Sequence, residues 1–232
     1  MAYIRKGLDS VVAKLSDQNY AQSLALYRLW FDIGQTHHQI PSDSILDAIW
    51  DNRGTGSMLN PKVGELIHSG ARLTLRFASD VESDRILAPH TSGLQSRLCA
   101  RSLQEFFDKN MEAICDNESR YSGTATRLYE NANLIAHWAN TGYVEEAVIC
   151  NQILQSLVSH PKLYGHQADA LVILFKLAGA TFEAYTDPPV VDRCFELLKD
   201  YYSHGSVERG LVQVRADHVM KGGYQAKTNF RN

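Results

Sequence analysis

The sequence predicts an all-α protein, and three observations support this prediction. Apolar residues recur at the spacing of an α-helix along nearly all of the 232 residues. Prolines and glycines fall between these apolar segments, where helices begin or end, as at Pro41, Gly142 and Pro161. Strand-like alternation is confined to the C-terminal region, where a β-hairpin through 211–214 and 224–230, turning at Gly222-Gly223, is the alternative to a last helix.

The N-terminal region predicts two successive helices. The first is short and amphipathic, with the apolar residues Leu8, Val11, Val12 and Leu15. We expect Ser16 to cap the second helix. That helix carries one apolar stripe made of Leu24, Tyr27 and Phe31, and a second made of Leu26, Leu29, Trp30 and Ile33. Because both stripes are apolar, we expect this helix to be buried on most sides.

The rest of the chain predicts further helices separated by short breaks. The clearest loop is 51–60, and a long helix is expected from Asn60-Pro61 to about Asp84, since asparagine caps a helix and proline suits its first turn. A break at 88–90 precedes a helix that carries Leu94 to Ile114. Helices are then expected over about 124–140, 143–159, 164–185, 189–202 and 206–220.

This pattern predicts one all-helical domain over 1–220, with a subdivision into 1–120 and 121–220 left open. We expect an irregular array of antiparallel helical hairpins, similar to an α-solenoid, and a single helical bundle is the alternative. Residues 221–232 are expected to form a flexible basic tail. From Ser203 to the end, five basic and two acidic residues give a local charge of +3, in a chain whose net charge is -3.

The overall charge excludes a general attraction to nucleic acid, so we expect no nucleic-acid partner. The N-terminus lacks the apolar core of a signal peptide, and the longest apolar run, 170–175, is too short to span a membrane. The four cysteines are widely spaced among apolar helical residues, which predicts buried, reduced thiols. We therefore expect a soluble intracellular protein, cytoplasmic or nuclear, with no membrane partner.

One stretch, Tyr129 to Pro161, resembles a tetratricopeptide-type helix–turn–helix repeat. Leu134, Trp138, Gly142 and Glu146-Ala147 fall where that family places a leucine, an aromatic residue, a turn glycine and a Glu-Ala pair. The last part of this pattern is echoed 37 residues later by Gly179 and Glu183-Ala184, so the resemblance covers about 129–184. The resemblance implies stacked helical hairpins that present a groove to a protein partner.

The same resemblance implies that the first helix of the hairpin lines the groove. On that helix a polar stripe recurs at helical spacing, and the candidate binding residues are Tyr129, Glu130, Asn133, His137 and Asn140. This face carries no basic residue, so a clamp for a partner's terminal carboxylate is not expected. An ordinary solvated helix face is the alternative interpretation.

No arrangement of residues predicts a metal or a cofactor. Glu65 and His68 have the Glu-x-x-His spacing of di-iron bundles, but the sequence holds no second copy. His37-His38, His160 and His166 lack cysteine or carboxylate partners at zinc-ligand spacing. The loop Gly54-Thr55-Gly56-Ser57 lacks the Lys-Ser/Thr that follows in a P-loop.

Three hypotheses about function follow. The first is a non-enzymatic helical interaction module, a scaffold or adaptor that binds a protein partner, with a second copy of itself among the candidates. The second is an all-helical enzyme with its site inside a bundle, drawing on Glu65, His68, Glu130 or His137. The third is a self-assembling structural domain of a larger protein, in which the basic tail Lys221–Asn232 docks on a neighbour.

Overall fold

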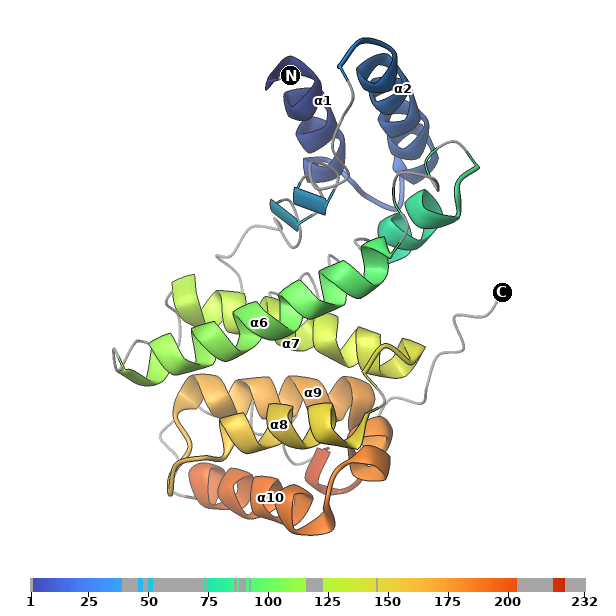
Figure 1. The fold of residues 1–232 in the computed structure, drawn as a ribbon. Helices are drawn as coiled ribbons and strands as arrows, with labels where there is room; N and C mark the ends of the chain where they lie inside the picture. The colour runs from blue at the N-terminus through green and yellow to red at the C-terminus, as the bar shows by residue number, and fades with distance from the viewer. Residues whose placement is uncertain are drawn as a thin grey trace. The chain divides into compact units, whose positions relative to one another are not determined.

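A computed structural model describes residues 2–38, 46–47, 50–51, 73, 75–85, 87, 91, 93–115, 123–144, 146–203 and 219–223. These residues are helical or form the turns between helices, and none of them lies in a strand, so the all-α prediction is confirmed for this part of the chain (Figure 1). The chain divides into two compact units, Met1–Ala100 and Arg101–Asn232. The domain limits expected from the sequence stay a prediction.

Unit 1 begins with a helical hairpin made of α1 (Ala2–Ala13) and α2 (Tyr20–His38). The turn between them is held by Asn19, whose side chain accepts a bond from the Ser16 amide at 2.8 Å and donates to the Lys14 carbonyl at 2.7 Å. The Asn19 carbonyl accepts the Ser23 amide at 2.8 Å, in the manner of an N-cap residue. The Ser16 hydroxyl accepts the Asn19 amide at 3.4 Å, so Ser16 caps the turn that leads into α2, and α2 itself begins at Tyr20.

The core of unit 1 forms where α2 meets the helical segment 75–83. Tyr27 and Phe31 of α2 are almost completely buried, as the first apolar stripe predicts, and Phe77 is buried with them. The Tyr27 and Phe77 rings meet edge to face with centroids 5.0 Å apart, a favoured aromatic geometry. The second stripe of α2 does not follow its prediction: Leu26, Leu29 and Ile33 are exposed.

A long helix, α6 (Leu94–Cys115), contains the boundary between the two units. Its first turn is capped from the segment 75–83: the Glu82 carboxylate accepts the amide of Gly93 at 2.9 Å and that of Gln95 at 3.2 Å. A carboxylate at this position satisfies free amides and is favoured by the helix dipole.

Unit 2 contains α7 (Gly123–Thr141), α8 (Ala147–Leu157), α9 (Gly165–Tyr185) and α10 (Pro188–Ser203). Helix α9 packs extensively on α7, and it also contacts α8 and α10 (Figure 1). Its core consists of small and aliphatic side chains together with Trp138, Phe175 and Phe182. The expected bounds of these helices are close to those observed, except that α8 begins at Ala147 rather than 143.

The later start of α8 follows from the turn after α7. Gly142 has φ +88°, and the Tyr143 amide donates to the Trp138 carbonyl at 2.9 Å, a bond that closes the end of α7. Glu146 is still extended at φ −83°, ψ 127°. Gly142 thus lies in the turn after α7, as predicted, and α8 begins five residues later, at Ala147.

The other glycine of the resemblance occupies a different position. Gly179 lies inside α9 and not in a turn, although the preceding residue, Ala178, interrupts the helix with φ −140° and ψ 25°.

Among the described helices, none is long and apolar enough to cross a membrane.

Candidate protein-interaction surface

The outward side of α2 carries a row of apolar side chains that follows the exposed Gln22. Leu26, Leu29 and Ile33 expose 48%, 55% and 38% of their surface, and their spacing of three and four residues places them on one side of the helix. Ala25 is exposed on the same side. We call these four residues the α2 outer face. A surface helix ordinarily carries polar residues in this position, so this face is a departure from the usual amphipathic pattern.

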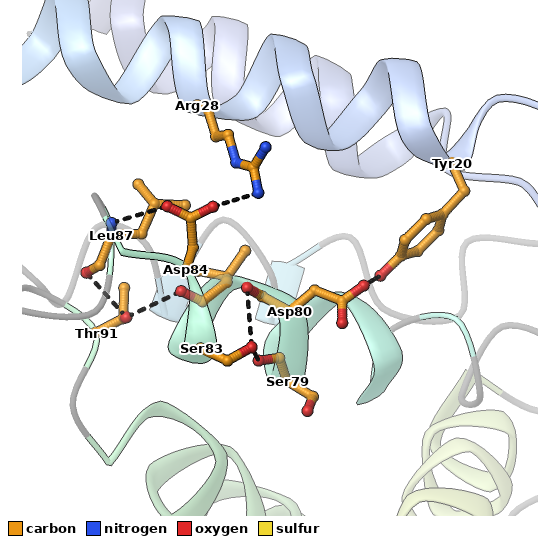
Figure 2. A network of polar contacts seen from close by, with 9 residues as sticks. Tyr20, Arg28, Ser79, Asp80, Ser83, Asp84, Leu87 and Thr91 are labelled. Atoms are coloured by element: carbon orange, nitrogen blue, oxygen red, sulfur yellow. Dashed lines mark hydrogen bonds and ion pairs between the residues drawn. The ribbon is translucent and has the colours of Figure 1, made fainter. Parts of the chain in front are cut away.

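The opposite side of α2 is fixed to the segment 75–84 by polar contacts (Figure 2). The Tyr20 hydroxyl donates to Asp80 Oδ2 at 2.7 Å, and Arg28 forms an ion pair with the buried carboxylate of Asp84. Arg76 lies 4.0 Å from the Tyr20 ring centroid, a cation–π contact. Burial first, and then the bond to Asp80, raise the pKa of Tyr20 above its ordinary value, so the hydroxyl remains a donor at neutral pH.

The carboxylate of Asp84 also organises the chain that follows the segment 75–83. Its Oδ1 accepts the Leu87 amide at 3.3 Å, while the Thr91 hydroxyl donates to the carbonyl of Leu87 at 3.0 Å (Figure 2). These bonds link Arg28 of α2 to the chain just before α6. Together with the buried Tyr27 and Phe31, they set the rotation of α2 about its axis and so determine which side faces outward.

An aromatic pair borders the α2 outer face on the side of α1. Trp30 meets Tyr3 edge to face with centroids 5.5 Å apart, and Tyr3 is 75% exposed. Trp30 can lie this close to α1 because residue 7 is glycine: a Cβ there would stand 2.7 Å from the indole ring. The outer face and Tyr3 thus form one apolar surface that extends from α2 to α1.

This arrangement leaves several apolar side chains of α2 exposed to water. Full burial of a leucine or isoleucine side chain contributes about 1.5–3 kcal/mol, and roughly half of that contribution remains available at Leu26 and Leu29. Exposed apolar patches bordered by polar residues commonly mark protein–protein interfaces. The exposed Asp32 lies along one edge of this row, and the exposed Gln22 lies at its N-terminal end.

The five candidate groove residues lie elsewhere, on α7, and three of them are buried. Glu130, Asn133 and His137 expose 4%, 2% and 6% of their surface. Glu130 pairs with Arg127 at 2.8 Å, and the Asn133 side chain donates to the carbonyl of Tyr129 at 2.8 Å. As partner-binding residues they stay a prediction, but in this structure a partner does not reach these three side chains.

The remaining two candidates join α7 to α9. The Tyr129 hydroxyl donates to Asp169 at 3.2 Å, and the Asn140 amide donates to the Leu177 carbonyl at 2.7 Å. Asn140 Oδ1 also accepts the Thr181 hydroxyl at 3.4 Å. Leu177 directly precedes the non-helical Ala178, so Asn140 satisfies a carbonyl at the point where α9 is interrupted.

Of the four residues considered for enzymatic chemistry, the structure describes Glu130 and His137, both buried on α7. Glu65, His68 and the loop Gly54–Ser57 lie outside the described residues, as do the side chains of His37 and His38. His166 is buried and stacks on Tyr164, with ring centroids 5.7 Å apart, while His160 meets the same tyrosine edge to face at 6.0 Å. No group of three or more His, Cys, Asp and Glu side chains suited to a metal occurs among the described residues.

Comparisons with protein-family models, with curated proteins and with solved structures return no match. The proposals below therefore depend on the geometry of this chain alone.

Leu26, Leu29 and Ile33 belong to a stripe that the sequence predicts to be buried. Two apolar faces on one helix are compatible with complete burial or with docking at a surface. A signal that points to docking is the neighbouring Asp32, since a charged residue beside an apolar stripe is more typical of an interface border than of a core.

Proposed function

We propose that this protein is a non-enzymatic helical interaction module that binds a protein partner through the α2 outer face. The observation that carries the proposal is the exposure of Leu26, Leu29 and Ile33 on a helix whose other side is fixed by a core and two polar anchors. Because the helix is held in this orientation before binding, docking does not require it to rearrange.

The same proposal includes the arrangement of helices α7 to α10 and the location of the protein in the cell. Helices α7 to α10 are an irregular array of antiparallel hairpins, similar to an α-solenoid and to tetratricopeptide repeats, and they serve as the scaffold that accompanies unit 1. The support is the hairpin with its turn at Gly142 and the packing of α9 on three helices. We place the protein inside the cell, in the cytoplasm or nucleus, because three of its four cysteines are buried and none of the four forms a disulfide.

Site-specific photo-cross-linking in the source cells tests the proposed function. A photoreactive amino acid replaces Leu29 in the full chain, and in a matched control it replaces Val148, which is 65% exposed on α8. We expect a discrete cross-linked product from position 29 that is absent from position 148. If positions 26, 29 and 33 all give no product beyond the control, the α2 outer face is not a docking surface.

A further inference from the structure

We draw no further inference here: the strongest candidate, the row of exposed apolar side chains on the outward side of α2, belongs to the surface already described, and nothing in the structure shows what covers it.

Discussion

At the scale of single residues, two apolar side chains on α2 have opposite environments. Leu29 is 55% exposed on the outer face, whereas Phe31, two residues later, is 1% exposed in the core. The structural role of each is determined by the side of the helix on which it lies, since successive residues are turned by about 100°. The same kind of substitution should therefore have different consequences at the two positions.

Leu29→Glu should leave the free energy of unfolding of the dilute, monomeric protein within about 0.5 kcal/mol of wild type, because surface substitutions rarely change more than that. Phe31→Ala should cost about 3–5 kcal/mol, since it removes a fully buried ring from the core of unit 1. Urea unfolding followed by circular dichroism measures both values. A loss of several kcal/mol in Leu29→Glu would mean that the outer face is part of a core.

The thiols give a second prediction at this scale. Cys99, Cys150 and Cys194 are buried and Cys115 is exposed, so the expectation of buried cysteines is correct for three of the four. Cys115 is exposed because it is the last residue of α6. A thiol reagent at neutral pH should therefore modify one cysteine per native chain rapidly and all four in denaturant. Rapid modification of three or four in the native protein would contradict the burial.

Alkaline pH should destabilise the protein through the same residues. Burial raises the pKa of Cys99 and of Cys194 from 9.0 to about 12. Between pH 9 and 12 the unfolded chain releases these protons while the folded chain retains them, so stability is complete below pH 9 and falls as pH rises. Each thiol contributes a slope of up to about 1.4 kcal/mol per pH unit. Cys194→Ala should show a shallower loss than wild type in urea unfolding at pH 8 and pH 10.5.

At the scale of elements, the interruption of α9 depends on a side chain from another helix. The Asn140 amide donates to the Leu177 carbonyl and accepts the Thr181 hydroxyl, so it satisfies both groups at the irregular turn. A side chain that inserts into the backbone hydrogen-bond ladder is an established cause of helix kinks. The polar stripe on α7 therefore has a structural role at this residue, in addition to any role in binding.

Asn140→Leu should cost about 1–3 kcal/mol, because the buried carbonyl of Leu177 loses its partner. The matched control is Gln152→Leu on α8, where the side chain is exposed, and it should change stability by no more than about 0.5 kcal/mol. Chemical denaturation provides both values. Equal effects at the two positions would contradict the role of Asn140 at the interruption.

The helices themselves were largely predictable from the sequence, and their orientations were not. Apolar periodicity and the joints at Gly142 and Pro188 determine the bounds of α7, α9 and α10 to within about two residues. The periodicity of α2 also identifies two apolar faces. It does not identify which one is covered, because that depends on Phe77 and Asp84, which lie far away in the sequence and pack on one side only.

The polar stripe on α7 predicts exposed side chains, but Glu130, Asn133 and His137 are buried, and the reason is related. A polar side chain on a helix can face water or can form bonds inside an interface, and the sequence pattern is the same in both cases. Glu130 is buried beside Arg127, and Asn133 bonds to the backbone of its own helix. Such contacts depend on the packing of α9 and on local geometry, which periodicity alone does not contain.

At the scale of the whole molecule, two compact units share one chain, and the division falls inside α6. Unit 2 has a core built on α9, with polar bonds from Asn110 to the Ser156 carbonyl and from Gln167 to Asn110 that join α6, α8 and α9. Among the described residues, it is unit 1 that carries the apolar surface with several exposed side chains on one helix face. We therefore expect a partner to bind to unit 1.

The most direct test of that assignment is radical footprinting of the side chains of α2, read by mass spectrometry. The purified protein at submicromolar concentration is compared with the same protein in its native extract, and Val148 serves as the internal control. We expect Leu26, Leu29 and Ile33 to be labelled in the dilute protein and protected in the extract, while labelling of Val148 is unchanged. Equal labelling of the α2 outer face in both samples would contradict the claim that a partner covers it.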